Sequence, residues 1–296
     1  MFKVRSSILL FFLGPAVFSI LIFFVLPVAF ALVLSLTDFD IYSLGDIKYV
    51  KFVGFGNYFK IISDPLFWKA LLNTIYFVFV GGPISIAVSL FSALLLQSRL
   101  VKFKKVLRFA FFAPVVTTLV AVAIVWRYLY HPRFGLFNQF LMIFGLDPIN
   151  WLGDPRFAMP SIIILAVWKN FGYNMLIFLA GLQNIPDELY EAAEIDGASF
   201  FQKFKNITLP MLSPTMLFVS LTTAIGYFQL FAEPYVMTQG GPLNSTLSIV
   251  LLMYQHGFKW WNIGYSTSIA FSLFFIVFLF SLLQLKVQKR GYIFTR

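Results

Sequence analysis

Six long apolar runs constrain this chain more than any other feature. Within a few residues at each end they are 8–34, 70–96, 109–130, 159–182, 214–237 and 266–285. The apolar core of a bilayer, roughly 30 Å thick, is crossed by about 20 apolar residues of helix. The runs are continuously apolar and lack the alternation that marks a barrel strand. The sequence therefore predicts an all-α polytopic membrane protein with six transmembrane helices.

Composition excludes a water-soluble protein. Hydrophobic residues make up 60% of the chain and charged residues only 11%, which is too few for a soluble surface. The chain has no Cys, so a disulfide framework, a thiolate metal site and a Cys nucleophile are all excluded. The two His residues have no carboxylate or Cys neighbours in the sequence, and we expect no metal site.

The basic residues indicate orientation in a membrane. The net charge is +10, but Lys and Arg lie between the apolar runs and not along one polar face, so we expect no nucleic-acid partner. Segments 1–7, 97–108, 183–213 and 286–296 carry 13 Lys and Arg in 61 residues, whereas the other connecting segments carry 7 in 91. The positive-inside rule then predicts that both termini are cytoplasmic.

The first apolar run has two interpretations. Lys3 and Arg5 precede it, as basic residues precede the apolar part of a signal peptide. Its 27 residues and the lack of a small-residue cleavage site favour a retained transmembrane helix instead.

One cytoplasmic segment, 185–212, does not read as a plain linker. Acidic residues crowd its start after Pro186, where they favour a helix N-terminus. Gly197 then suits a left-handed turn, and a second short amphipathic stretch ends at Pro210. The pattern predicts a helix, a turn and a helix. By pattern alone, this element either covers the bundle as an interfacial loop or docks a cytoplasmic partner.

The same segment carries a family motif. It contains Glu191, Ala192 and Ala193, then Gly197, then Ile207, Leu209 and Pro210, a spacing that resembles the EAA signature loop of the permease subunits of bacterial ABC importers. Further stretches, namely FVGFGNY from Phe52, LLNT from Leu71, TQGGP from Thr238 and GYSTSIAFS from Gly264, resemble the sugar-permease branch that contains the maltose and glycerol-3-phosphate systems. The resemblance covers essentially the whole chain and is closer to the maltose-F-like member of the permease pair.

The resemblance implies a type I ABC importer permease fold, with 1–296 as one transmembrane domain and 185–212 as its cytoplasmic coupling loop. Implied partners are a second homologous permease, two nucleotide-binding ATPase subunits and an extracytoplasmic sugar-binding protein, in the cytoplasmic (inner) membrane of a bacterium or archaeon. The sequence has no G-x-x-x-x-G-K-[ST] phosphate loop, so the chain is expected to be no enzyme, and ATP and Mg²⁺ would bind the ATPase subunits. The residues implied to contact that subunit are Glu191, Ala192, Ala193, Asp196 and Gly197.

A substrate pathway needs polar groups at membrane depth. Similarity to related permeases implies that Asn170, Tyr173, Thr223, Gly226 and Tyr227 line a sugar site, and hydroxyl and amide groups beside aromatic rings suit a neutral sugar. The same polar residues could instead bond between helices. Lys169 is added to the pathway because a Lys near midspan is costly in lipid.

The sequence can be interpreted with either of two kinds of substrate, and it can be compared with two other classes of membrane protein. Lys169 leaves open an anionic substrate such as glycerol-3-phosphate, although a neutral mono- or oligosaccharide is preferred. Glu233 is the only acidic residue within any predicted span and could contact either a ligand or a basic group. An ion-coupled secondary transporter would be expected to show paired intramembrane carboxylates or an inverted repeat, and a membrane enzyme would need a catalytic constellation. The sequence shows none of these, so both classes are disfavoured.

Overall fold

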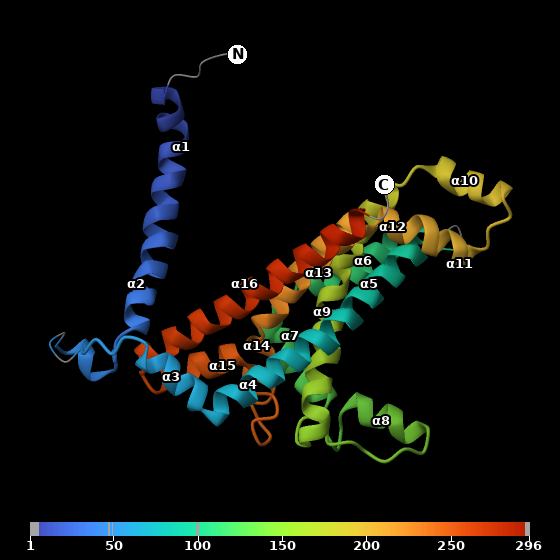
Figure 1. Cartoon of the computed structure of the whole chain (residues 1–296). Helices are drawn as coiled ribbons and strands as arrows, with labels where there is room; N and C mark the ends of the chain where they lie inside the picture. Colours follow the sequence, from blue (N-terminus) through green and yellow to red (C-terminus); the bar gives the residue numbers. More distant parts are fainter. Residues whose placement is uncertain (1–5, 47, 49, 99–100, 294–296) are drawn as a thin grey trace. The chain divides into compact units, whose positions relative to one another are not determined.

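The computed structural model describes residues 6–46, 48, 50–98 and 101–293 (Figure 1). The described residues form helices joined by turns, with one isolated bridge between Thr37 and Phe52. They fall into two compact units, one within 6–67 and 252–275 and the other within 68–251 and 276–293. The boundary falls inside the helices α4 (Pro65–Tyr76), α15 (Ile249–Tyr254) and α16 (Ile263–Ile293).

The first unit begins with one long apolar helix. α1 (Ser6–Ile20), a π-helical turn (Leu21–Val25) and α2 (Leu26–Ser35) follow one another without a break. No side chain in the most apolar part of Phe11–Ser35 is buried against the rest of the chain. A helix that is apolar all round and unburied needs an apolar solvent, so this element suits lipid.

The FVGFGNY stretch supplies side chains that hydrogen-bond to the end of α2. Within α3 (Gly56–Ser63), the Asn57 amide donates hydrogen bonds to the carbonyl oxygens of Ser35 and Thr37 at 3.0 and 2.7 Å. The hydroxyls of Tyr58 and Ser35 are 2.9 Å apart. The last carbonyls of a helix have no partner within the helix, and Asn57 supplies one.

The other part of this unit centres on a π-helical turn (Gln255–Lys259) and the start of α16. The Tyr265 hydroxyl donates to Asp64 at 2.8 Å, and the His256 ring lies 4.6 Å from both the Trp260 and Tyr265 rings. Burial lowers the pKa of His256, and the Asp64 carboxylate opposes that effect. His256 is therefore half-buried among aromatic rings.

The second unit packs around α9 (Pro155–Gln183). α9 lies against α5 (Gly82–Gln97), which continues from α4 through a π-helical turn (Phe77–Gly81), and against α6 (Lys104–Val116). α13 (Ser213–Phe228) also contacts α5 and α9. The buried core joins these helices through Ala93, Leu96, Met175, Phe178, Leu179, Leu182, Ile185, Leu212 and Val219.

Two predicted spans are interrupted. The sequence predicted one helix over 109–130, but α6 ends at Val116, α7 (Leu119–Leu129) begins after two extended residues, and the helices are bent by 100°. Pro114 weakens the helix there, and the Thr117 hydroxyl donates to the Pro114 carbonyl at 2.6 Å, which competes with helix continuation. The predicted 214–237 helix is likewise broken after Phe228 and resumes as α14 (Ala232–Met237).

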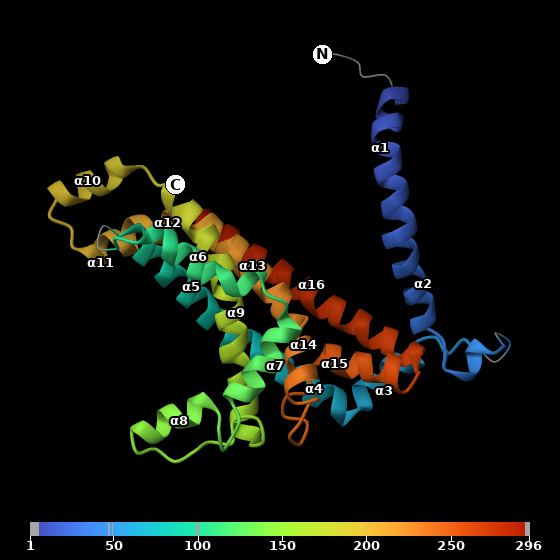
Figure 2. The ribbon, with the colours of Figure 1, turned by 180° about the vertical axis from the view of Figure 1, so that it is seen from behind.

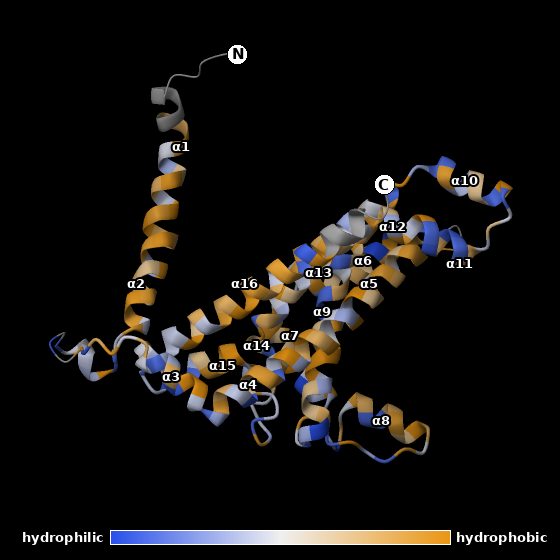
Figure 3. Cartoon of the chain, in the orientation of Figure 1, coloured by the Kyte–Doolittle hydropathy of each residue, from blue (hydrophilic) through white to orange (hydrophobic). Residues whose placement is uncertain are grey.

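The two ends of α9 carry different elements (Figures 1 and 2). α8 (Leu136–Ile143) precedes one end, while α10 (Asp187–Ile195), α11 (Phe200–Lys203), a π-helical turn (Phe204–Thr208) and α12 (Leu209–Met211) follow the other. Figure 3 shows α10 and α11 as largely hydrophilic beside the apolar helices of the unit. The polar helical hairpin thus lies at the end of α9 opposite to α8.

Five helices in the described chain are long and apolar enough to cross a membrane. They are Phe11–Ser35, Pro65–Gln97, Pro155–Gln183, Ser213–Met237 and Ile263–Val287. The bent pair Lys104–Val116 and Leu119–Leu129 makes a sixth if it counts as one span. The chain is therefore a helical protein with five or six candidate spans, and most helices extend beyond the predicted runs.

The segment after α14 is braced by side-chain hydrogen bonds. The hydroxyls of Thr238 and Thr246 lie 2.7 Å apart, and Thr246 also bonds the carbonyl of Gly241 at 2.7 Å. The Asn73 amide donates to the carbonyls of Asn244 and Leu247 at 2.8 and 2.9 Å. The LLNT stretch and the segment that follows TQGGP, far apart in sequence, therefore meet through Asn73.

Replacing Asn73 by Leu is expected to destabilise this segment by about 1–3 kcal/mol, because two carbonyls lose their donor. The measurement is thermal unfolding of the purified protein in detergent, with Asn73→Leu compared to the original chain. Lys69→Ala, an exposed position on the same helix, serves as the control. Equal unfolding temperatures for the two variants would show that the bonds of Asn73 contribute nothing.

Candidate functional site

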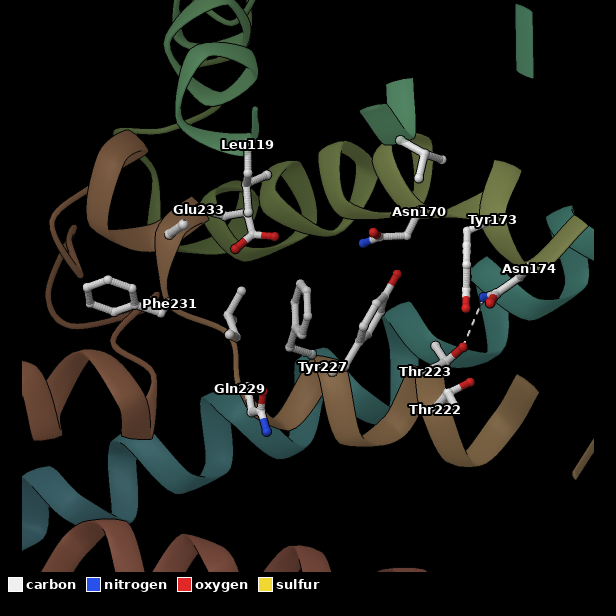
Figure 4. A pocket seen from close by; sticks show the side chains of 15 residues that line it. Leu119, Asn170, Tyr173, Asn174, Thr222, Thr223, Tyr227, Gln229, Phe231 and Glu233 are labelled. Atoms are coloured by element: carbon white, nitrogen blue, oxygen red, sulfur yellow. Dashed lines mark hydrogen bonds between the residues drawn. The ribbon is translucent and has the colours of Figure 1, made fainter. Parts of the chain in front are cut away.

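A pocket of about 420 Å³ opens in the second unit (Figure 4). Its wall comes from α9, from α13 and α14, from the residues on either side of the α6–α7 bend, and from the π-helical turn at Phe77. The polar lining residues are Asn170, Tyr173, Asn174, Thr222, Thr223, Tyr227, Gln229 and Glu233. A volume of this size is within the range of small-molecule sites.

The lining combines amides, hydroxyls and aromatic rings. The Asn174 amide donates to the Thr223 hydroxyl at 2.9 Å, which joins α9 to α13 (Figure 4). The rings of Phe77 and Tyr227 pack with centroids 4.7 Å apart. The Tyr227 hydroxyl lies beside Ser85 and Asn170, but neither the Tyr227 nor the Ser85 oxygen has a hydrogen-bond partner of normal geometry in the described chain. Buried hydroxyls without partners are costly, and a ligand or water would satisfy them.

The residues assigned to a substrate pathway from the sequence separate into two groups. Asn170, Tyr173, Thr223, Gly226 and Tyr227 all line this pocket. Lys169 does not, although it precedes Asn170 on α9. Its side chain is buried, and its ammonium group donates to the carbonyl of Val115 at 3.0 Å.

Sequence reasoning missed several parts of the wall. Phe77, Val115 and Leu119 were not considered, because nothing in the apolar runs shows which of their residues face a pocket. The role of Glu233 was left open, and the structure places it in the lining with 7% of its surface exposed. In the described chain, no group of three or more His, Asp or Glu side chains lies close enough to hold a metal ion.

The helical hairpin at the far end of α9 has a tight turn. α10 ends at Ile195, and Gly197 follows with a φ of +74°. The Gly197 N–H donates to the Glu194 carbonyl at 3.1 Å and the Ala198 N–H to the Ala193 carbonyl at 2.8 Å. These bonds satisfy carbonyls at the end of α10. The turn requires a positive φ at residue 197, which glycine adopts without steric cost.

The start of α11 and the base of the hairpin are also fixed. Ser199 and Gln202 form a reciprocal capping box, and Lys203 pairs with Glu194 at 2.8 Å. The Tyr190 and Thr208 hydroxyls are 2.9 Å apart, so α10 is tied to the turn before α12. Contacts between its own side chains therefore stabilise the conformation of the hairpin.

The hairpin presents a mixed polar and apolar surface. Glu191, Ala192, Asp196 and Gly197 are exposed and Ala193 is half-buried. Exposed apolar side chains accompany them, with Ile195 88%, Phe200 77% and Phe201 69% exposed. Apolar groups exposed on a polar hairpin mark a surface suited to contact with another protein.

The chain is similar in sequence to known proteins over most of its length. The chain is 39% identical to the arabinooligosaccharides transport system permease protein AraP of Bacillus subtilis over 241 residues, 81% of this chain and 77% of that protein. It is also 39% identical to the lactose transport system permease protein LacF of Rhizobium radiobacter, over 79% of this chain and 80% of that one. These relatives are permease proteins of transport systems.

The fold is shared with a solved transporter. A chain in the crystal structure of a bacterial alginate ABC transporter, in complex with a periplasmic protein bound to alginate pentasaccharide, superposes with a TM-score of 0.79 over 97% of this chain and 96% of that chain. Their sequences are 20% identical, so this similarity concerns the fold. Residues 4–290 match the family described as binding-protein-dependent transport system inner membrane component. With that match and relatives at 39% identity, the chain belongs to the family of inner membrane components of binding-protein-dependent transport systems.

Proposed function

We propose that this chain is the maltose-F-like permease subunit of an ATP-driven sugar importer. The observation that carries the proposal is the pocket in the second unit, whose amides, hydroxyls and aromatic rings suit a neutral mono- or oligosaccharide. The relatives named for arabinooligosaccharide and lactose transport support the same class of substrate. The chain would cross the membrane six times, with both termini in the cytoplasm, and would act as one permease domain.

The helical hairpin would be the coupling element. α9 leads into it and α13 leads out of it, and these two helices carry most of the polar pocket wall. Asn170 lies 14 residues before Asn184, or about 21 Å along a helix. Movement of the hairpin would therefore be transmitted through rigid helices to the pocket.

The partner at the hairpin would be a separate ATPase subunit. The exposed Glu191, Ala192, Asp196 and Gly197, with the half-buried Ala193, would form the contact. Closure of two such subunits on ATP would move the hairpin and open the pocket to alternate faces of the membrane. A second permease would complete the pathway, and an extracytoplasmic sugar-binding protein would deliver the substrate to the inner membrane of a bacterium or archaeon.

The test is to tag this chain in its host, extract it gently, identify the subunits that co-purify and assay ATP hydrolysis. We expect a second permease and an ATPase, with hydrolysis stimulated severalfold by a sugar-loaded binding protein. Recovery of the chain alone, from membranes in which a control complex survives extraction, would contradict the proposal. So would sugar transport by the purified chain without ATP.

A further inference from the structure

Among the described residues that line the pocket, Glu233 is the only acidic or basic one. Of the residues that line the pocket in the described chain, Glu233 is the one carboxylate, and none is Lys, Arg or His. Its side chain is 7% exposed. Figure 4 shows the Glu233 carboxylate and the Asn170 amide pointing toward one another from α14 and α9. A substrate in this space would meet an acceptor at Glu233 and no cationic side chain.

The Glu233 carboxylate is not neutralised by a salt bridge. Lys169 is close enough to interact with it electrostatically, but no nitrogen–oxygen distance of 4.0 Å or less joins them in the described chain. Its lone pairs are therefore available to a ligand, apart from a hydrogen bond with its own backbone.

Lys169 is engaged elsewhere. It donates to the carbonyl of Val115, one residue before the end of α6 at the 100° bend. The last carbonyls of a helix have no intrahelical partner, and a cation there is favourable. Arg127 makes the equivalent contact, since its guanidinium donates to the carbonyl of Val236 at 3.3 Å, one residue before the end of α14. Both basic residues within the predicted spans thus bind carbonyls where a broken span ends.

From this geometry we propose that Glu233 is the specificity-determining charge of the pocket, and that it accepts hydrogen bonds from hydroxyls of an uncharged sugar and repels acidic sugars. Lys169 is a positioning residue that holds the α6–α7 bend, whose residues Val115 and Leu119 form part of the wall. The inference rests on the proposed sugar import and disfavours an anionic substrate.

The test uses the complete importer in proteoliposomes with its binding protein. The probes are radiolabelled lactose, maltose and arabinobiose, each paired with the matching sugar acid, in which one CH₂OH group is a carboxylate. We expect uptake of a neutral probe, and in Glu233→Gln a fall of about tenfold in neutral sugar transported per ATP, because an amide oxygen accepts a weaker hydrogen bond than a carboxylate does. Stimulated ATP hydrolysis is expected to stay within twofold, which shows that the complex is assembled. Asp147→Asn, an exposed carboxylate outside the pocket, is the matched control and should change neither quantity.

The role of Lys169 in holding the α6–α7 bend is tested by the thermal stability of the complex. Lys169→Met is expected to lower the unfolding temperature of the complex without changing the ratio of neutral to acidic sugar transported per ATP. Lys169→Arg is expected to restore most of the unfolding temperature, because a guanidinium can also donate to the Val115 carbonyl.

Several outcomes would overturn the inference. The first is uptake of acidic probes alone by the original importer. The second is that Glu233→Gln transports as much neutral sugar per ATP as the original, or that it loses ATP hydrolysis and uptake in parallel. The third is a changed ratio of neutral to acidic sugar transported in Lys169→Met. An original complex with no stimulated hydrolysis and no uptake of any probe would instead remove the proposed function, and the inference with it.

Discussion

Replacing Gly197 by proline is expected to abolish sugar uptake while the protein remains in the membrane. Gly197 has a φ of +74°, and its N–H donates to the Glu194 carbonyl at 3.1 Å. Proline fixes φ near −65° and has no N–H, so neither the conformation nor the bond can persist. The turn between α10 and α11 would open, and the exposed surface of α10 would no longer be presented to an ATPase subunit in one orientation.

The measurement for Gly197→Pro is uptake by whole cells, with the amount of chain in the membrane fraction determined in parallel. Gly197→Asn is the matched control, because asparagine tolerates positive φ and keeps the N–H, so it should retain most of the uptake. A Cβ at this position meets no atom within 4 Å, so Asn introduces no clash. Normal uptake by Gly197→Pro would refute the assignment of the hairpin as the coupling element.

The location of the apolar helices could be predicted because a helix that crosses the apolar core of a bilayer needs a long run of apolar residues. The runs at 8–34 and 159–182 correspond to Phe11–Ser35 and Pro155–Gln183. The bend after Val116 could not be predicted with the same certainty. Proline and threonine also occur within helices that continue, as Pro160 does inside α9, and tertiary contacts decide which of them ends a helix.

Some of the residues that line the pocket could be predicted from the sequence, and others could not. Asn170 and Tyr173 were assigned to a sugar site from the similarity to related permeases, and they line the pocket together because residues three apart on a helix share a face. Lys169 was added to them because a Lys near midspan is costly in lipid, but adjacent residues of a helix point about 100° apart. The Val115 carbonyl that Lys169 contacts needs a partner from outside the helix because α6 ends there, and sequence alone did not reveal that end.

Gly172 of α9 lies against the backbone of α6, and replacing it by alanine is expected to destabilise the protein strongly. A Cβ at this position would clash with the carbonyl oxygen of Phe111 and would lie 3.1 Å from the Cα of Phe112, both in α6. These are backbone atoms, so no side-chain rotation can relieve the contact, and α6 and α9 would have to separate. Overpacking of this kind commonly costs about 1–3 kcal/mol and can cost more, and we expect Gly172→Ala at the upper end of that range.

The displacement would also reach the pocket, because Phe111 lies about one helical turn before Val115, and Asn170 and Tyr173 flank Gly172. Gly172→Ala should therefore lower both the unfolding temperature of the purified complex and its sugar uptake. Gly82→Ala is the matched control, since Gly82 is a buried helical glycine of the same unit whose added Cβ meets nothing within 4 Å. Alanine there gains helix propensity of up to about 1 kcal/mol, so Gly82→Ala should be at least as stable as the original chain. If Gly172→Ala matched Gly82→Ala in both measurements, the close approach of α6 to α9 would not be needed to form the pocket wall.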